Sequence, residues 1–361
     1  MRTAFLGLMA SAFVVWGCTP QRVSAPAGAS APAAGPPTAG APAAGTAPTT
    51  GAAAAGTAST ADSCSSGKPL TVHFLNVGQG LSVLVDLPND KHILVDAGPS
   101  SSVVDSLKTT LSTTNLDWLW ITHQHTDHYG GARAVLKAYT VDTFIDNGES
   151  SDKTTEEALH KLVAEKNATY VVVSPTKRQL PNLDTGLVKI SLAAPSSWPV
   201  SNCDGDNANN CSIGLRLDFC KSSVLLVGDA EQAEEAQLIG TVGPATLLQV
   251  GHHGSATSTS DAFLAAVKPQ YAVVSAGKPN EGMNTGYCHP REVTVDRLFR
   301  NLGNVQAGTI DAFDETGKCS KMTPAPTHWH QVPTSDRMWF TERDGDVVLS
   351  TKGDGTFQRV K

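Results

Sequence analysis

Short runs of apolar and β-branched residues, separated by turn residues, recur along the chain from Leu70 onward. Turn signals such as Gly78-Gln79-Gly80 and Pro88-Asn89-Asp90 divide the first of these runs from one another. The pattern predicts strands over Leu70–Leu75, Leu81–Asp86, His92–Asp96, Leu119–Thr122, Thr143–Ile145, Tyr170–Ser174, Leu187–Ala193, Ile213–Phe219, Ser223–Val227, Thr246–Val250 and Tyr271–Ser275. Helices are expected over Gly131–Tyr139, Thr155–Lys166, Ala230–Gln237, Asp261–Val267 and Glu292–Asn301. Because strands and helices are mixed in both halves of the chain, the pattern favours an α/β sandwich with helices on the outside.

The C-terminal part of the chain adds two features. Trp339–Phe340 and Val347–Leu349 flank the turn signal Asp344-Gly345, so they are expected to form a closing hairpin. Within Pro324–Arg337, the triplet His328-Trp329-His330 could touch a metal ion or a substrate, but we expect an exposed loop there.

The N-terminus has the pattern of a targeting segment. Arg2 precedes the largely apolar run Ala4–Trp16, which is short for a membrane span and typical of a signal peptide. The following Gly17-Cys18 resembles a bacterial lipobox, whose Cys is lipidated and becomes the first residue of the mature protein. An ordinary secretory signal and an uncleaved anchor are the alternatives. We expect residues 1–18 to be a lipoprotein-type signal peptide, and the protein to be exported and lipid-anchored through Cys18 to the cell envelope, outer membrane or cell surface.

Residues 19–63 consist almost entirely of Ala, Gly, Pro, Ser and Thr. A segment of this composition cannot bury a hydrophobic core, so it is expected to be a disordered tether. Residues 64–361 are long enough for one sizeable core and are expected to form the folded domain.

The overall composition narrows the class of protein. A formal net charge of −7 and a pI of about 5.9 exclude the broad basic footprint of a strong nucleic-acid binder. A hydrophobic content of 40% and a mean hydropathy of −0.14 exclude a membrane-embedded helix bundle. Of the seven Cys, six remain besides Cys18, and an even number in an exported chain suggests disulfides. Cys203 and Cys211 flank a polar loop and are plausible partners, and Cys288 and Cys319 could pin the C-terminal segment.

The densest group of metal-ligating residues follows the predicted strand Leu119–Thr122. His123, His125, Asp127 and His128 lie within six residues of one another. A loop at a strand end can turn the first two to one side and the last two to another, so that two metal ions sit side by side. Neutral imidazole and carboxylate are ligands that zinc prefers.

Three later segments bring an acid or a His to the junction of a strand or loop with a helix. They are Val227-Gly228-Asp229-Ala230, Val250-Gly251-His252-His253-Gly254-Ser255 and Tyr287-Cys288-His289-Pro290. Such junctions lie on one rim of a sheet sandwich, so these side chains are expected to share one site with the first group.

The segment His123–Gly131 resembles the signature of the metallo-β-lactamase fold. A finer pattern resembles the hydrolase domain of ComEC-type competence proteins, and its motifs are His73-Phe74-Leu75-Asn76-Val77-Gly78-Gln79-Gly80, Leu94-Val95-Asp96-Ala97-Gly98, Val227-Gly228-Asp229, Gly251-His252-His253-Gly254-Ser255 and His289-Pro290. The resemblance runs from about Leu70 to Arg300. It implies a four-layer αββα sandwich that carries one or two zinc ions at its strand-end rim.

The resemblance also implies roles for individual residues. The implied metal ligands are His123, His125, Asp127, His128, Asp229 and His253, with Asp229 bridging both ions and His253 preferred over His252. Asp96 would orient a ligand from behind it. Asp127 or Asp229 would hold the attacking hydroxide, and His252 or His289 would donate a hydrogen bond to the developing charge or protonate the leaving group. The implied cofactor is two Zn²⁺ ions, with Mn²⁺ or another divalent metal as an alternative.

The chain departs from the β-lactamases of this fold, which add a third His between the first motif and the bridging acid. Only His160 lies between His128 and His252, and we expect it to face solvent from its helix. The stretch Asn207-Ala208-Asn209-Asn210 resembles instead an Asn-rich segment of the ComEC group, which also lacks that His. Because the first metal then keeps more open coordination, this departure favours phosphodiesters over β-lactams.

We therefore expect a secreted, lipid-anchored binuclear zinc hydrolase that acts as a phosphodiesterase or nuclease. The expected partners are a phosphodiester substrate, DNA included, and the membrane through Cys18, and no obligate protein partner is evident. One alternative is a hydrolase of a small envelope ester, such as a phosphocholine ester, a lactone or a thioester. Another is a zinc-stabilised binding module, which is disfavoured because a purely structural site needs no open coordination positions.

Overall fold

The computed structural model describes residues 67–150, 153–303, 305–314, 319 and 328–361, all of which belong to one compact unit, Gly56–Lys361. The predicted signal peptide (1–18) with Cys18 and the predicted tether (19–63) lie outside the described residues. The domain boundaries drawn from the sequence therefore stay predictions.

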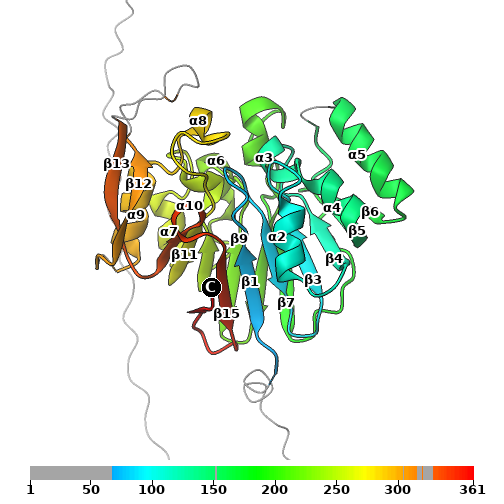
Figure 1. Ribbon diagram of the computed structural model, residues 1–361, viewed down its shortest axis with the longest axis horizontal. Coiled ribbons are helices and arrows are strands. Elements are labelled where there is room, and N and C mark those ends of the chain that lie inside the picture. Colours follow the sequence, from blue (N-terminus) through cyan, green and yellow to red (C-terminus); the bar gives the residue numbers. More distant parts are fainter. Residues whose placement is uncertain (1–66, 151–152, 304, 315–318, 320–327) are drawn as a thin grey trace, which may run out of the picture. The chain divides into compact units, whose positions relative to one another are not determined.

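Two large β-sheets form the centre of the described chain (Figure 1). The first has the order β16-β15-β1-β2-β3-β4-β5-β6, with bounds β1 Leu70–Phe74, β2 Val83–Asp86, β3 His92–Val95, β4 Asn115–Trp120, β5 Thr140–Asp146, β6 Thr169–Val172, β15 Val347–Thr351 and β16 Gln358–Arg359. The second has the order β14-β11-β10-β9-β8-β7, with bounds β7 Val188–Ala193, β8 Gly214–Phe219, β9 Ser222–Leu226, β10 Leu247–Gln249, β11 Tyr271–Val274 and β14 Met338–Phe340.

Each sheet has an antiparallel and a parallel part. In the first sheet β1 pairs antiparallel with β2 and β15, whereas β3, β4, β5 and β6 run parallel. In the second sheet β7, β8 and β9 are antiparallel, whereas β9, β10, β11 and β14 run parallel. Because parallel strands end at the same edge of a sheet, the loops that follow them gather there, where ligands bind in open α/β sheets.

The inner faces of the two sheets pack against each other. Phe74 of β1 and Leu217 of β8 are fully buried in the core between them. Trp120, at the end of β4, also links the sheets, because its Nε1 donates a hydrogen bond of 2.7 Å to the backbone oxygen of Ile213. A buried indole N–H needs such a partner. This bond fixes the end of β4 just before the loop that begins at Thr122.

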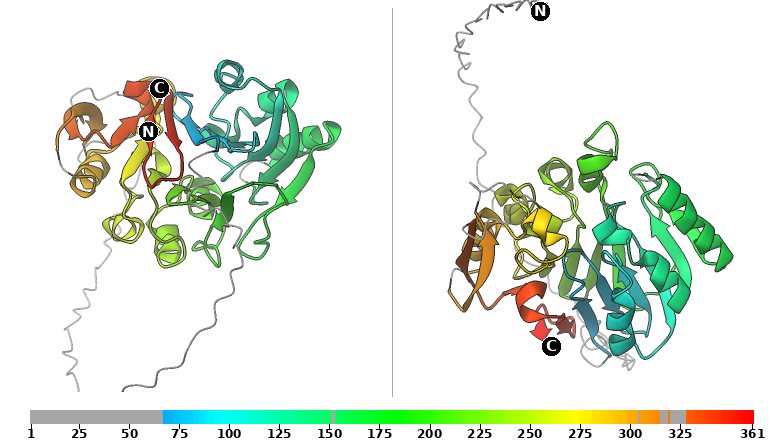
Figure 2. Two further views of the ribbon diagram at one scale, coloured as in Figure 1. Left: turned by 90° about the horizontal axis from the view of Figure 1, so that it is seen from below. Right: turned by 45° about the horizontal axis from the view of Figure 1, so that its top comes forward.

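Helices cover the outer faces of both sheets, as Figures 1 and 2 show. Those packed on the first sheet are α2 (Val103–Thr110), α4 (Ala132–Ala138) and α5 (Lys153–Glu165), and those packed on the second are α6 (Gln232–Leu238), α7 (Asp261–Val267) and α9 (Glu292–Asn301). Shorter turns lie in the loops, namely α3 (Thr126–Tyr129), η1 (Gly205–Cys211), η2 (Gly251–Gly254), α8 (Asn284–Tyr287) and α10 (Thr341–Asp344). The predicted αββα sandwich is confirmed.

The bounds of helix α7 follow from its own residues, namely a capping residue at its start and an apolar face along its length. The Ser260 hydroxyl accepts a hydrogen bond of 3.2 Å from the backbone N–H of Phe263, which caps the first turn. Phe263, Leu264 and Val267 are buried along one face. The chain then leaves the helix through Lys268, whose φ of 47° is left-handed. Both α7 and α9 have the bounds predicted from the sequence.

The predicted C-terminal hairpin is wrong. Strand β14 pairs parallel with β11 in the second sheet, whereas β15 pairs antiparallel with β1 in the first. Between them the chain forms α10, and Asp344 accepts a hydrogen bond of 2.9 Å from the Phe340 backbone N–H. The turn signal Asp344-Gly345 therefore ends a helix that carries the chain from one sheet to the other. Met338 and Phe340 of β14 are buried in the core on the outer side of the second sheet, whereas Val347 and Leu349 of β15 are buried in the core between the sheets.

The expected exposed loop within Pro324–Arg337 is also wrong for the part that the structure describes. Trp329–Thr334 forms β13, which pairs antiparallel with β12 (Gly308–Phe313) in a separate two-stranded sheet. His328 Nδ1 and His330 Nε2 lie 3.0 and 3.1 Å from Oδ2 of Asp314. Neither β12 nor α2 is evident from the sequence pattern.

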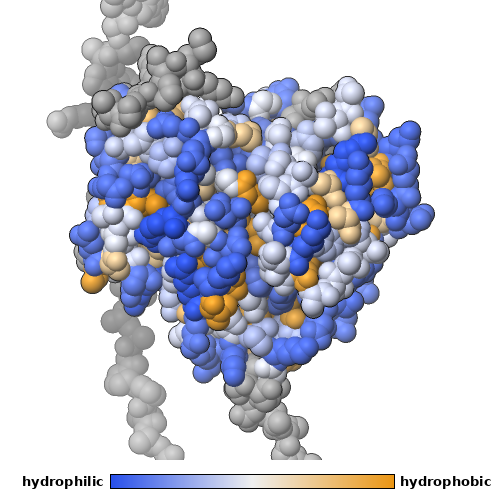
Figure 3. All heavy atoms as spheres, viewed as in Figure 1, coloured by the Kyte–Doolittle hydropathy of each residue, from blue (hydrophilic) through white to orange (hydrophobic). Residues whose placement is uncertain are grey.

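The face of the molecule in Figure 3 is mainly hydrophilic, with apolar side chains scattered among polar ones. Scattered apolar side chains are normal on a folded surface. Among the described residues, no helix has both the length and the apolar composition needed to cross a bilayer.

Candidate metal centre

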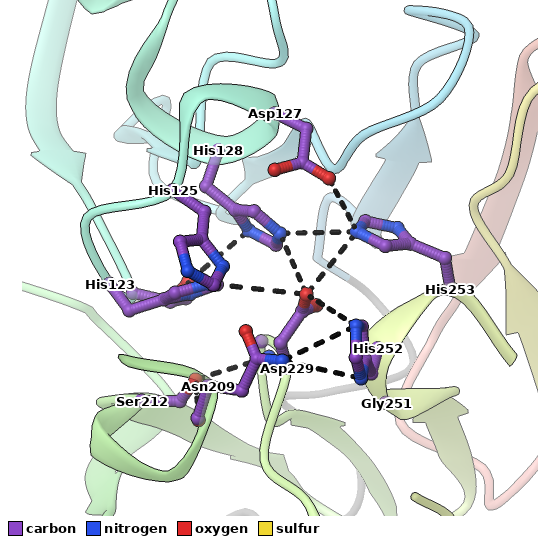
Figure 4. Close-up of polar contacts among 12 residues, drawn as sticks. His123, His125, Asp127, His128, Asn209, Ser212, Asp229, Gly251, His252 and His253 are labelled. Carbon is purple, nitrogen blue, oxygen red and sulfur yellow. Dashed lines mark hydrogen bonds and ion pairs between the residues drawn. The ribbon is translucent and has the colours of Figure 1, made fainter. Parts of the chain in front are cut away.

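The four segments singled out in the sequence meet at one rim of the sandwich. His123, His125 and the turn α3 follow β4, Asp229 follows β9, and the turn η2 with His252 and His253 follows β10. Since β4 belongs to the first sheet and β9 and β10 to the second, the side chains approach one another from both sheets (Figure 4).

The backbone is strained where the site is built. Asp96, His252 and His253 have φ values of 58°, 46° and 54°, in the left-handed region that non-glycine residues rarely occupy. Such conformations persist only where the surrounding structure enforces them, and they cluster at functional sites. Gly228, with a φ of 59°, precedes Asp229, and a Cβ there would lie 2.8 Å from the Thr122 side chain. Only glycine therefore lets the β9 loop approach the β4 loop this closely.

One group of ligand atoms combines His123, His125 and Asp229. His123 Nε2 lies 3.0 Å from His125 Nδ1 and 3.9 Å from Asp229 Oδ2. Three side-chain atoms that converge within 4.8 Å of one another can share one cation.

A second group combines Asp127, His128 and His253. His253 Nε2 lies 3.3 Å from Asp127 Oδ2 and 3.2 Å from His128 Nε2. All three side chains are almost completely buried. The structure therefore divides the His123–His128 cluster between two groups, with His123 and His125 in one and Asp127 and His128 in the other, and their roles as metal ligands stay predictions.

Asp229 joins the two groups. Its Oδ2 lies 3.1 Å from His128 Nε2 and 3.4 Å from His253 Nε2, besides its contact with His123. Its Oδ1 is buried and has no hydrogen-bond partner among the described residues. A buried carboxylate oxygen without a partner is costly unless something else binds it. The donor set therefore fits divalent cations, with Asp229 able to contact two of them.

Each of the four imidazoles is oriented through its other nitrogen. His123 Nδ1 and the Thr122 hydroxyl lie 3.1 Å apart, and His128 Nδ1 donates to Asp96 Oδ2 at 2.7 Å. In the same way, His253 Nδ1 donates to the backbone oxygen of Ser275 at 2.8 Å and His125 Nε2 to that of Gly205 at 2.9 Å. Such bonds fix the tautomer and leave the opposite nitrogen with a lone pair for a metal ion. Asp96 occupies the orienting position that the sequence analysis expected.

The pKa shifts of the candidate ligands differ in sign. The shifts of Asp229 and His123 favour the deprotonated forms that bind a metal ion, whereas the shift of His253 favours its protonated form. Burial raises the pKa of Asp229, but the charges of His128 and His253 outweigh this effect and hold that pKa well below its usual value. Burial, with the nearby His128 charge, lowers the pKa of His123. Burial also lowers the pKa of His253, yet Asp229 and Asp127 raise it to about 9. A cation bound there must therefore displace the His253 proton.

His252 lies beside the two groups and belongs to neither. Its Nε2 is 3.9 Å from Asp229 Oδ2, and its Nδ1 is 3.1 Å from Glu231 Oε1. Glu231 in turn accepts hydrogen bonds from the Asn210 amide at 2.9 Å and the Thr257 hydroxyl at 2.6 Å. The geometry agrees with the preference for His253 over His252 as a ligand, although both roles stay predictions.

The two groups open into a cavity of about 570 Å³. His289 lines this cavity, is itself buried, and has an Nδ1 without a hydrogen-bond partner among the described residues. Burial, followed by the charges of His252 and His253, lowers its pKa well below the usual value. The Tyr287 ring stacks on His289, with the ring centroids 6.3 Å apart. Of the described residues that line the cavity, Arg291 is the one Lys or Arg.

The expectation that His160 faces solvent is wrong. Its Nε2 lies 2.7 Å from Asp146 Oδ2, and the Tyr170 hydroxyl donates to Asp146 Oδ1 at 2.9 Å. The His160 ring also packs on Tyr170 at 4.5 Å, which leaves its side chain 29% exposed. A buried carboxylate at the end of β5 needs partners, and His160 and Tyr170 supply them. The contact set lies outside the candidate metal centre.

Two predicted disulfides are confirmed, Cys203–Cys211 and Cys288–Cys319. Cys220 is also disulfide-bonded, and Cys64 lies outside the described residues. The first disulfide closes the loop that contains η1, and Cys319 lines the site cavity. Both disulfides therefore stabilise loops at the rim.

Sequence reasoning gave no site role to Asn209, Glu231, Tyr287 or Arg291, although all four line the cavity. The Asn-rich stretch was a signal for Asn209, and Glu231 stands two residues after Asp229. Tyr287 stands in the segment singled out for His289, but the pattern gave it no role of its own, and nothing in the pattern marks Arg291, because each reaches the cavity only through the fold of the segment after β11.

Comparison with known proteins identifies the family. The model of the metallo-beta-lactamase superfamily matches residues 75–278. Recombination protein 2 of Haemophilus influenzae is 34% identical over 241 residues, which cover 65% of this chain and 27% of that protein. ComE operon protein 3 of Bacillus subtilis is 28% identical over 265 residues (66% and 32%), and competence protein ComA of Neisseria gonorrhoeae is 32% identical over 229 residues (62% and 28%).

The chain thus spans about a quarter to a third of the length of these relatives. The matched segment contains β2 to β11 and all the residues of both ligand groups. The chain belongs to the metallo-beta-lactamase superfamily, as a metal-dependent hydrolase that resembles the hydrolase domain of ComEC-type competence proteins.

Proposed function

We propose that this protein is an exported, lipid-anchored hydrolase that holds two zinc ions and cleaves phosphodiesters, DNA among them. The observation that carries the proposal is the position of Asp229 Oδ2, which lies between two groups of ligand atoms and contacts both. A carboxylate in this position can bridge a pair of metal ions, the arrangement that clamps the attacking and leaving oxygens of a phosphoryl transfer.

The two groups would each hold one ion. His123, His125 and Asp229 would hold the first, and Asp127, His128, His253 and Asp229 the second. When bound, the ions lower the pKa of a water molecule to near neutrality and polarise a phosphoryl oxygen. Zinc suits this mixture of imidazole and carboxylate, and Mn²⁺ is the alternative.

The residues around the ions suit a phosphodiester. The cavity is acidic, because Asp127, Asp206, Asp229 and Glu231 line it, and Arg291 is the one Lys or Arg among the described residues that do so. A phosphodiester anion would be repelled from these carboxylates alone, whereas two divalent cations reverse the sign of the local field. Arg291 would then bind a non-reacting phosphoryl oxygen, and the exposed Tyr287 ring would offer a face to a base or sugar.

His289 would act on the leaving group. Its lowered pKa keeps the ring neutral, so it can donate one N–H hydrogen bond to the developing negative oxygen. Asp127, buried beside His253, would hold the attacking water in line.

One observation supports DNA as a substrate, and another supports a location at the cell envelope. The relatives carry names that refer to recombination and competence. The Gly17-Cys18 pair and the Ala/Gly/Pro-rich segment 19–63 support a lipid anchor followed by a spacer.

The test is a substrate panel with the purified full chain, comprising bis-p-nitrophenyl phosphate, single-stranded and plasmid DNA, nitrocefin and a simple lactone. We expect zinc- or manganese-dependent cleavage of the phosphodiesters and negligible turnover of nitrocefin. Asp229→Ala should lose bound metal and activity together, whereas Asp105→Ala, at an exposed position on α2, should behave like the wild type. Efficient hydrolysis of nitrocefin or the lactone with inert phosphodiesters would overturn the proposal.

A further inference from the structure

The two ligand groups are unequal. Asp127, His128 and His253, together with the shared Asp229, offer four protein ligands to one ion, whereas His123, His125 and Asp229 offer three to the other. His252 does not belong to the smaller group, because its Nδ1 pairs with Glu231 and its Nε2 faces the Asn209 amide nitrogen at 3.3 Å. A metal site on the His123 side therefore has a further position, which a fourth side chain can take if the coordination expands to five to admit water or substrate.

Asn209 has an atom suited to that position. Its side chain is 4% exposed and lines the site cavity, and its Oδ1 is buried without a hydrogen-bond partner among the described residues. Its Nδ2 lies 3.4 Å from Glu231 Oε1 and 3.3 Å from His252 Nε2. Because the Glu231 carboxylate can only accept hydrogen bonds, the atom of the Asn209 amide that faces it must be the nitrogen, Nδ2. Figure 4 shows the Asn209 amide between the His123–His125 pair and His252, with its nitrogen on the His252 side.

Hydrogen bonds of the segment around Asn209 fix its position relative to His125 and Asp229. The backbone oxygen of Asn209 accepts a hydrogen bond of 2.8 Å from the Ser212 hydroxyl, and that hydroxyl accepts one of 3.1 Å from the Asp229 N–H. The same turn, η1, supplies the Gly205 oxygen that orients His125. The Cys203–Cys211 disulfide closes this segment. Two members of the smaller group, His125 and Asp229, and Asn209 itself are therefore held by one short segment, residues 203–212.

We propose that Oδ1 of Asn209 is the fourth protein ligand of the ion held by His123, His125 and Asp229, an inference that rests on the proposed two-metal centre. The amide oxygen is neutral, so it adds a ligand without adding charge to an already acidic cavity. It is also a harder ligand than imidazole, and carbonyl oxygen is well suited to Mn²⁺. The site on the His123 side should consequently bind its ion more weakly than the His253 site and accept Mn²⁺ more readily.

The test measures metal content rather than activity. Wild type, Asn209→Leu, Asn209→Asp and Asn207→Ala are dialysed against buffered free zinc and analysed by elemental analysis, with circular dichroism as a check on folding. Asn207 is the matched control, because it lies on η1 but is exposed and its amide bonds to Asn202. We expect about two ions in the wild type, Asn209→Asp and Asn207→Ala, and about one in Asn209→Leu, with affinity at the lost site reduced by about 10-fold or more.

The Asp variant distinguishes a ligand from a purely structural residue. Asn209→Asp keeps an oxygen for the metal but replaces the donor to Glu231 with a like charge, so a structural role predicts that it fails as badly as Asn209→Leu. Full retention of two ions at wild-type affinity in Asn209→Leu, or equal metal loss in the Asp and Leu variants, would overturn the proposal. A wild type that binds fewer than two ions would instead refute the two-metal centre on which it rests.

Discussion

The Nδ1 atom of His128 donates a hydrogen bond of 2.7 Å to Oδ2 of Asp96, and both side chains are completely buried. The Thr122 backbone N–H and hydroxyl also donate to the Asp96 carboxylate, each at 2.8 Å. Asp96 thereby connects the end of β3 to the loop that carries the ligands. A carboxylate behind a ligating imidazole fixes its orientation and raises its basicity.

Asp96→Asn should therefore weaken metal binding without unfolding the protein. The amide replaces one accepting oxygen with a donor, which cannot accept the His128 proton, and loss of such a partner typically costs about 10- to 100-fold in affinity. Competition with a zinc chelator measures the effect, and Asp105→Asn on the exposed side of α2 serves as the control. Unchanged affinity would show that Thr122 alone orients the site.

His289→Ala should lower turnover and leave the metal content intact. His289 lines the cavity but lies in neither ligand group, and loss of a positioned hydrogen-bond donor or proton-transfer group typically costs about 100-fold or more in rate. Parallel measurements of kcat and of bound zinc test this, with His160→Ala as a control because His160 pairs with Asp146 outside the cavity. Metal loss in His289→Ala would contradict its assignment as a non-ligand.

Glu342 should make the stability of the protein depend on pH. It lies in α10, and both of its carboxylate oxygens are buried with no hydrogen-bond partner among the described residues. Burial, and then the charge of Asp311, raise its pKa from 4.5 to about 9. The folded carboxyl therefore keeps a proton that the unfolded one releases. The contribution of Glu342 to the free energy of unfolding is complete below about pH 4.5 and is lost as the pH rises toward about 9.

Glu342→Gln should remove this loss. Between about pH 5 and about pH 8, the wild type should lose at least ~1 kcal/mol more unfolding free energy than the variant. Urea titrations at both pH values give the difference, and Glu281→Gln is the control, because Glu281 is exposed although it lines the same surface cavity as Glu342, one that is separate from the site cavity. Parallel pH profiles for wild type and Glu342→Gln would mean that the folded carboxyl is ionised.

Cys18→Ala should abolish the proposed lipid anchor. Without the thiol no lipid can be attached, so the protein should move from the detergent phase to the aqueous phase or stay unprocessed at residues 1–18. Detergent phase partition and the mass of the N-terminal fragment measure both effects. Thr19→Ala should partition like the wild type, and unchanged partition and processing in Cys18→Ala would refute the anchor.

The sequence by itself determined the elements whose signals are local. Helix α7 follows its Ser260 cap and apolar face, and the ligand cluster His123–His128 follows a buried strand, so both could be read from neighbouring residues. The rim location also follows from sequence, because an acid or a His recurs directly after several strands. These features depend on interactions within a few residues, which the order of residues specifies directly.

Only the tertiary structure decided which distant segments pair. Phe340 and Val347 are close in sequence, yet they join different sheets, because each strand buries its apolar face best against a strand far away in the chain. For the same reason the role of Asn209 depends on Glu231 and Asp229, which reach it from beyond β9. A ligand site is a convergence of side chains from both sheets, and its geometry exists only once the sheets have packed face to face.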